Sequence, residues 1–177
     1  IDRADAYYYY GDTKDMRDRM ADFIIKLTNH MRSKKPDVAI LVQNAEELLD
    51  RPNYVAAIDG IAKEDLLYGI SHKEELNKKS DVDWSTNLLK PFKAQNKAVF
   101  VIEYLTRPNY IADAKSRLDQ LGFVFGNRDR RRQLPIHGQA VALVGPRLLA
   151  RRQQGRRRQD RRELGMDGGI EHRSRRP

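Results

Sequence analysis

The clearest indication of the fold is Ala98–Ile102, five apolar residues reading Ala-Val-Phe-Val-Ile that stop at Glu103. A continuous apolar run of strand length predicts a strand buried on both faces, as in the parallel sheets of α/β proteins. Val38–Val42 has the same character, and Ala56–Ile61 and Gly122–Phe125 are two further candidate strands. Ile1-Asp2 is typical of the last step of another strand. These runs predict a sheet assembled from segments spread along the chain.

Helical patterns lie between the apolar runs. Residues 15–33 place Met16, Met20, Phe23, Ile24 and Met31 at the spacing of one helical face. Residues 81–96 and 110–121 show similar patterns, and residues 45–50 indicate a loop or a short helix. Strands that alternate with helices predict an α/β protein with parallel strand pairing, either doubly wound or a (β/α) barrel.

Composition narrows the class of protein. The 177 residues are enough for one domain, and 40% of them are hydrophobic. No Cys is present, which excludes disulfides, thiolate nucleophiles and Cys-ligated zinc. No apolar run approaches the roughly 18–20 residues of a membrane-spanning helix. We therefore expect no membrane span.

The formal charge of +9 is unevenly distributed along the chain. Residues 1–127 carry 12 Lys and 7 Arg against 20 acidic residues, a net charge of −1. Residues 128–177 carry 15 Arg, no Lys and 5 acidic residues, a net charge of +10. Residues 1–127 therefore have no electrostatic footprint for nucleic acid, and we expect no such partner for them.

Acidic residues stand where the candidate strands end: Asp2, Glu46, Glu47, Asp59 and Glu103. The carboxyl ends of parallel strands meet at one edge of the sheet, where active sites of α/β proteins are built. Converging carboxylates would suit glycoside hydrolysis, in which one carboxyl protonates the leaving oxygen and another acts as nucleophile or activates water. The alternative is that each acid is solvated or caps the following helix.

Other side chains that could bind a ligand or take part in catalysis indicate a function less clearly. Tyr7–Tyr10 form a run of aromatic residues that either stack on sugar rings or divide between the core and the rim, and Tyr104 adjoins Glu103. The four His residues have no metal-ligand spacing, and the glycines form no dinucleotide fingerprint. We predict no metal and no cofactor, and by elimination the carboxylates are the best catalytic candidates.

An internal similarity links two turns of the chain. Glu47–Ala56 and Glu103–Ala112 both contain Arg-Pro-Asn-Tyr, and both follow an apolar run and lead into a helical segment. Proline is favoured at a helix start because its missing N–H would be unpaired there. The two copies are either similar strand-to-helix turns or equivalent rim loops of a barrel.

Four ordered segments resemble those of a known family: Ile1–Tyr7, Gln43–Leu49, Ala57–Gly69 and Val99–Leu105. The family is the glycoside hydrolase family 114 group, the endo-α-1,4-polygalactosaminidase-like proteins, some of which carry an old label relating them to cysteinyl-tRNA synthetase. The resemblance covers residues 1–129 and implies the second half of a (β/α)8 TIM barrel, from the end of strand four to strand eight. On this mapping Val38–Val42, Ala57–Ile61, Val99–Ile102 and Phe123–Phe125 are strands five to eight.

The resemblance also implies an activity and its residues. It implies hydrolysis of α-1,4-linked galactosamine polymers by a catalytic Asp and Glu, which match Asp2 and Glu46, with Asp5 and Glu47 as the shifted alternative. A retaining mechanism is expected, with the two carboxyls about 5–5.5 Å apart. A location outside the cell or in the cell envelope is implied as well. The expected substrate-binding residues are Tyr7, Tyr8, Asn44, Asp59, Glu103 and Tyr104.

Residues 130–177 depart from the family pattern. Their sequence is rich in Arg and lacks Phe, Tyr and Trp. Such a sequence is typical of translation in a wrong frame or of another non-homologous segment. It also fits a disordered basic tail, or an arginine-rich arm that binds nucleic acid or another polyanion. For the chain as a whole the alternatives to a hydrolase are an inactive carbohydrate-binding barrel remnant and a basic protein that binds nucleic acid through this tail.

Overall fold

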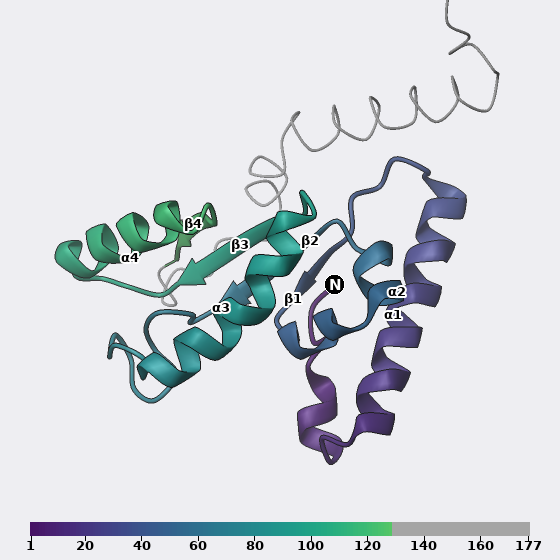
Figure 1. The fold of residues 1–177 in the computed structure, drawn as a ribbon, viewed down its shortest axis with the longest axis horizontal. Helices are drawn as coiled ribbons and strands as arrows, with labels where there is room; N and C mark the ends of the chain where they lie inside the picture. Colours follow the sequence, from purple (N-terminus) through teal and green to yellow (C-terminus); the bar gives the residue numbers. More distant parts are fainter. Residues whose placement is uncertain (129–177) are drawn as a thin grey trace, which may run out of the picture. The chain divides into compact units, whose positions relative to one another are not determined.

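The structure is a computed structural model that describes residues 1–128. Its centre is a four-stranded parallel sheet in the order β1-β2-β3-β4, built from β1 (Leu41–Gln43), β2 (Gly60–Glu64), β3 (Ala98–Glu103) and β4 (Val124–Asn127). The helices follow the same order, from α1 near β1 to α4 near β4 (Figure 1). The predicted α/β class is confirmed, and the sheet is consistent with a partial TIM-barrel-like domain.

Local sequence signals set the helix boundaries. In α1 (Lys14–Lys34), the side chain of Thr13 accepts a hydrogen bond from the Met16 N–H, Asp15 lies in the first turn, and Arg32 and Lys34 lie in the last. These charges favour the two ends of the helix dipole. The helix buries Ala21, Ile24 and Thr28, whereas Phe23, expected on the buried face, is 58% exposed.

The two Arg-Pro-Asn-Tyr turns both begin helices, as their sequence predicts. Pro52 opens α2 (Pro52–Ala57), and Pro108 opens α4 (Pro108–Gln120). Between them, α3 (Lys79–Ala94) carries Pro91 inside the helix. Two 3-10 helices complete the fold: η1 (Ala6–Tyr10) before α1, and η2 (Glu46–Asp50) after β1.

The strand predictions are correct in order, but their boundaries shift. The predicted start of the second strand at Ala56 or Ala57 is wrong, because these residues end α2 and β2 starts at Gly60. Asp59 therefore precedes β2 and lies at its amino end. Ile1 is not part of a strand, but it runs beside β1, donating to the Leu41 carbonyl at 2.6 Å and accepting the Gln43 N–H at 2.9 Å.

The core lies between the sheet and its helices. Val42, Ile61, Val99 and Val101 share one face of the sheet and are at most 1% exposed. Phe100 and Ile102 on the other face are only partly buried, so the expected burial on both faces is seen on one face alone. No helix in residues 1–128 is long and apolar enough to cross a membrane. The predictions for the Arg-rich tail concern residues outside the described range.

Candidate active site

The carboxyl ends of the strands border an open cleft of about 440 Å³. Asp5 and Tyr8 come from the η1 region, Asn44 and the two glutamates of η2 follow β1, and Lys63 and Glu64 end β2. The wall is completed by Asp65, Gly69 and Ile70 from the loop after β2, and by Trp84 of α3. The cleft therefore lies at the edge of the sheet where parallel α/β proteins place their active sites.

A strained backbone presents the two glutamates of η2. Asn44 and Ala45, between β1 and η2, have φ angles of 55° and 60°, which non-glycine residues rarely adopt. Asn44 is held across the strands: its side-chain amide donates to Glu64 Oε2 at 3.1 Å, and its side-chain oxygen accepts the Glu64 N–H at 3.0 Å. Such strain persists where surrounding contacts over-determine it, which is common at functional sites.

Glu46 is held by two side chains. It is 2% exposed, and its Oε1 accepts a hydrogen bond from Ser85 Oγ at 2.6 Å. The same oxygen lies 3.1 Å from Lys63 Nζ. A buried carboxylate needs such partners, because removal from water penalises its charge.

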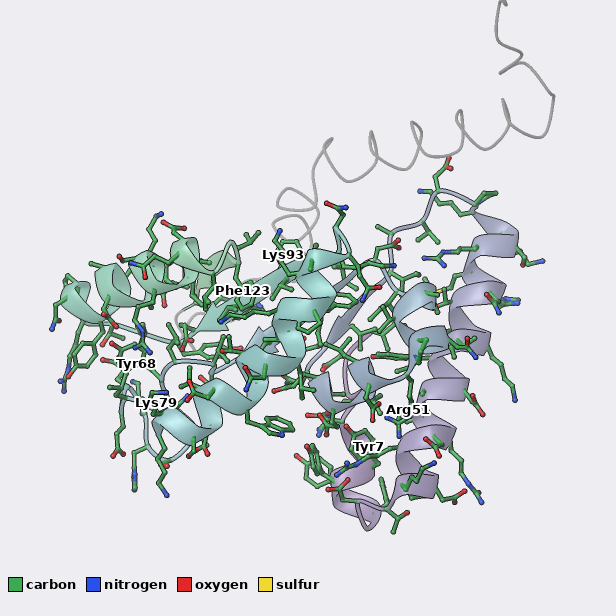
Figure 2. The ribbon with its side chains drawn as sticks, in the orientation of Figure 1. Tyr7, Arg51, Tyr68, Lys79, Lys93 and Phe123 are labelled. Carbon is green, nitrogen blue, oxygen red and sulfur yellow. The ribbon has the colours of Figure 1, made fainter. Side chains whose placement is uncertain are left out.

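Glu47 is held from η1 and from Arg51, the residue between η2 and α2. The Tyr7 hydroxyl donates to Glu47 Oε1, and the Arg51 guanidinium donates to the Glu47 carbonyl at 3.3 Å. Tyr7 and Arg51 are labelled in Figure 2. Arg51 also pairs with Asp18 of α1 at 2.7 Å, which ties Glu47 to the first helix. Burial and the hydrogen bond to Glu47 raise the pKa of Tyr7, so its hydroxyl stays protonated and acts as the donor.

Asp5 is a cleft carboxyl with a raised pKa. Burial raises the pKa of Asp5, and the nearby charges of Asp2 and Glu47 raise it further, against the opposing effects of a backbone hydrogen bond and of Arg3. Asp2 is exposed, accepts the Arg3 N–H at 2.7 Å and is not among the residues that line the cleft. Of the two sequence assignments for the aspartate, Asp5 is the one at the cleft wall.

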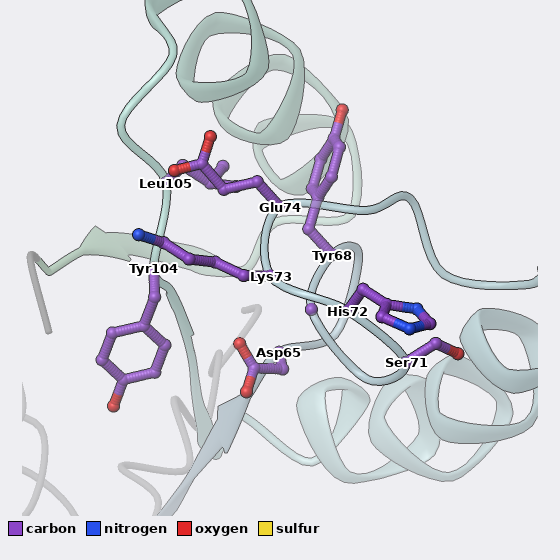
Figure 3. A pocket seen from close by; sticks show the side chains of 9 residues that line it. Asp65, Tyr68, Ser71, His72, Lys73, Glu74, Tyr104 and Leu105 are labelled. Atoms are coloured by element: carbon purple, nitrogen blue, oxygen red, sulfur yellow. The ribbon is translucent and has the colours of Figure 1, made fainter.

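A smaller cavity of about 100 Å³ adjoins the cleft and shares Asp65 and Gly69 with it. In Figure 3 the Asp65 carboxylate lies between Tyr104 and His72, and the Lys73 side chain extends toward the segment that carries Tyr104. The Tyr104 hydroxyl donates to Glu64 Oε1, which connects β3 to the cleft. Gly69 has a φ of +98°, and a Cβ there would lie 2.7 Å from Asp65 Oδ1, so only glycine lets this carboxylate approach.

The structure brings together some predicted site residues and separates others. Asp5, Tyr8, Asn44, Glu46 and Glu47 line the cleft, while Tyr7 is buried behind Glu47 and Tyr104 lies in the adjoining cavity. Asp59 lies at the opposite edge of the sheet, because β2 begins after it rather than before it. There it pairs with Arg32 at 2.9 Å and accepts the Ile40 N–H at 2.7 Å.

Glu103 ends β3 but lines neither cavity. It is fully buried, and its Oε1 accepts the Leu67 N–H at 2.8 Å, so it holds the loop after β2. Burial raises the pKa of Glu103 to about 7, although backbone N–H groups of that loop oppose the shift. The position of Glu103 at a strand end predicted contact with the substrate. In the structure the residue instead lies buried under the loop after β2.

Sequence reasoning missed four cleft residues that carry charge or an aromatic ring: Lys63, Glu64, Asp65 and Trp84. Glu64 and Asp65 lie in the Ala57–Gly69 segment that resembles the family. Because β2 spans Gly60–Glu64, they stand at a strand end like the other acids. Trp84 had no such signal, because α3 reaches the cleft only through tertiary packing. Among residues 1–128, no group of three or more His, Asp or Glu side chains is arranged to hold a metal.

Comparison with known proteins agrees with this geometry. Residues 1–131 match the family model of glycoside-hydrolase family GH114. An uncharacterized protein of Deinococcus radiodurans is 28% identical over 125 residues, which cover 70% of this chain and 40% of that protein.

Two solved structures share the fold. The glycoside hydrolase domain of PelA from Pseudomonas aeruginosa has a TM-score of 0.55 and 18% identity, covering 72% of this chain and 51% of that one. A variant of that domain has a TM-score of 0.50 and 18% identity, covering 72% and 57%. The chain thus spans about half the length of these structures and less than half of the Deinococcus protein. With its family model matched over most of its length, the chain belongs to glycoside-hydrolase family GH114.

Proposed function

We propose that this chain supplies the carboxylate-bearing part of a glycosidase that cleaves α-1,4-linked galactosamine polysaccharide. Family membership supports a glycoside hydrolase function. The observation that carries the proposal is the convergence of Asp5, Glu46 and Glu47 on one open cleft at the carboxyl edge of the sheet. The sheet would then form the second half of a (β/α)8 barrel, with the expected strands five to eight as β1 to β4.

The proposed catalytic pair is Asp5 with Glu47. Both line the cleft, and each is close enough to the other for the Glu47 charge to raise the pKa of Asp5. A raised pKa suits the residue that must hold a proton before the glycosidic bond breaks. Glu46, held by Ser85 and Lys63, is the competing partner, as Asp2 is for Asp5.

The proposed reaction follows the retaining scheme. The Asp5 carboxyl gives its proton to the glycosidic oxygen as the bond from that oxygen to the sugar C1 breaks, while a Glu47 oxygen forms a bond to C1. Asp5, now ionised, then takes a proton from a water molecule whose oxygen attacks C1 and releases Glu47. The hydroxyl of Tyr7 would steady the Glu47 carboxylate throughout.

The substrate class also suggests a location. A polysaccharide of this kind is met outside the cell or at its envelope, so we place the protein there. Galactosamine units without acetyl groups are cationic, which suits a cleft lined by carboxylates better than it suits an Arg-rich tail.

The test is reducing-end release from partially deacetylated α-1,4-galactosamine polymer. It uses the 177-residue chain alone and joined to the N-terminal part of its longer Deinococcus relative. The panel is Asp5→Asn and Glu47→Gln beside Asp2→Asn and Glu46→Gln. Loss of turnover in the first two, with activity retained in Asp2→Asn, is the expected result. A folded protein that binds the polymer but releases no reducing ends in either form would contradict the hydrolase and leave a carbohydrate-binding remnant.

A further inference from the structure

Large exposed apolar side chains gather at the cleft. Tyr8, Ile70 and Trp84 are 49%, 53% and 50% exposed, and all three line it. They come from three separate segments: η1, the loop after β2, and α3. Exposed apolar surface that converges on one concave site is typical of a ligand groove rather than of core packing.

Trp84 is held in position by its neighbour. Ser85, the next residue of α3, donates to the buried Glu46 carboxylate at 2.6 Å, so this turn of the helix is tied to the floor of the cleft. Ile70 is fixed as well, because its N–H donates to Asn77 Oδ1 at 2.9 Å. The backbone positions that carry Trp84 and Ile70 are therefore set by contacts within the chain, which reduces the entropy cost of ordering this wall on binding.

The negative charge of the cleft that Trp84 lines favours a cationic ligand. Five carboxyl groups line the cleft, those of Asp5, Glu46, Glu47, Glu64 and Asp65, and the cleft lining includes a single lysine, Lys63, 3.1 Å from Glu46. The indole is the best aromatic partner for a cation. A protonated amino sugar offers both complementary parts, a ring with an apolar face and an ammonium group.

We propose that Trp84 is the stacking platform of a sugar subsite, on which a protonated amino-sugar unit lies with its ammonium group between the indole face and the carboxylates of the cleft. This inference rests on the proposed function for the identity of the sugar, but binding at Trp84 does not require turnover. Tyr8 and Ile70 form further parts of the same wall. An N-acetylated unit keeps the ring but lacks the cation, so the subsite selects against it.

The experiment uses Trp84 as its own reporter, because it is the only tryptophan of the chain. The full 177-residue chain is titrated with a short α-1,4-galactosamine oligomer and, separately, with its N-acetylated counterpart, while tryptophan emission is recorded. A saturable change in emission with the galactosamine oligomer is expected, and a weaker response with the acetylated one. Saturation seen by calorimetry without any change in emission would overturn the proposal, as would no binding by calorimetry.

Variants make the test independent of fluorescence. By calorimetry Trp84→Ala should bind the galactosamine oligomer roughly 2- to 30-fold more weakly, and Trp84→Phe should lie between it and the wild type. Phe23→Ala, at an aromatic that is 58% exposed on α1 and does not line the cleft, is the matched control and should bind like the wild type. Wild-type affinity in a folded Trp84→Ala would overturn the proposal.

The outcomes separate this inference from the proposed function. If the wild type hydrolyses polymer and Trp84→Ala has an unchanged KM, the hydrolase stands and the subsite falls. If the wild type does not hydrolyse polymer but its binding depends on Trp84, the subsite stands and the hydrolase falls.

Discussion

Ser85 Oγ lies 2.6 Å from Glu46 Oε1, joining the middle of α3 to a carboxylate that follows β1, 39 residues earlier in the chain. The contact is buried, since Ser85 is 5% and Glu46 2% exposed. It fixes both a carboxylate of the cleft and the turn of α3 that carries Trp84. One hydroxyl thus links a carboxylate of the cleft to its apolar wall.

Ser85→Ala tests this link. Removing the hydroxyl leaves the Glu46 carboxylate with its ion pair to Lys63, and a hydrogen bond to a charged group contributes about 1.5–3 kcal/mol. We expect the free energy of unfolding, measured in urea, to fall by about that amount. Ser80→Ala is the control, because Ser80 is exposed in the first turn of α3 and its hydroxyl donates to its neighbour Asp81 at the surface. Equal stability of the two variants would contradict the structural role of Ser85.

Tyr7→Phe removes the donor that faces Glu47. The ring remains and fills its place, so the effect is that of the lost hydrogen bond to a nearly buried carboxylate, about 1–3 kcal/mol in the free energy of unfolding. If Glu47 is catalytic, kcat should fall more than KM changes. Tyr9→Phe, at a residue 73% exposed, should leave stability unchanged within error. A Tyr7→Phe protein with wild-type stability and kcat would refute this role.

Glu103 predicts a pH dependence of stability. Its pKa is raised in the folded protein to about 7 from an ordinary value of 4.5, so the folded state favours the protonated form. The stabilisation is complete below pH 4.5 and is lost as the pH rises through 7, amounting to about 3 kcal/mol. Chemical denaturation across this range should show the decrease, and Glu103→Gln should flatten it. Asp22→Asn, at an exposed residue of α1, should keep the wild-type slope.

Asp5 predicts a pH dependence of activity. As the proposed proton donor it must be protonated, so kcat/KM should decrease as the pH rises through the raised pKa of Asp5. Because the Asp2 charge contributes to that shift, Asp2→Asn should lower the pKa of Asp5 and move the alkaline limb of the pH profile to lower pH. Complete loss of turnover in Asp2→Asn would instead make Asp2 the catalytic aspartate.

Asn77 holds the loop after β2 through three side-chain hydrogen bonds, so its removal should loosen that loop. Its side-chain amide donates to the carbonyls of Asp65 at 2.8 Å and Leu66 at 3.0 Å, and its oxygen accepts the Ile70 N–H. Asn77→Ala should lower the free energy of unfolding by about 2–4 kcal/mol and speed hydrogen exchange at the Ile70 amide. Asn87→Ala, on the exposed side of α3, is the control. Unchanged exchange at Ile70 would show that the loop is held by other contacts.

Fold class and element order follow from local sequence patterns. The apolar runs at Val38–Val42 and Ala98–Ile102 predict strands because a packed sheet face favours apolar side chains, and Pro52 and Pro108 mark helix starts because their missing N–H would be unpaired there. The same logic placed Glu46 and Glu47 after a strand, at the edge where the cleft lies.

Which acids share the cleft depends on tertiary packing. A shift of the β2 start to Gly60 moved Asp59 to the opposite edge and brought Glu64 and Asp65 to the cleft, and local sequence does not fix strand boundaries that closely. Burial separated Glu103, which holds a loop, from the acids that line the cleft. Trp84 lies at the cleft because of how α3 packs, with Ser85 bound to Glu46 across the fold. A contact between residues so far apart in the chain is not encoded by any local sequence pattern.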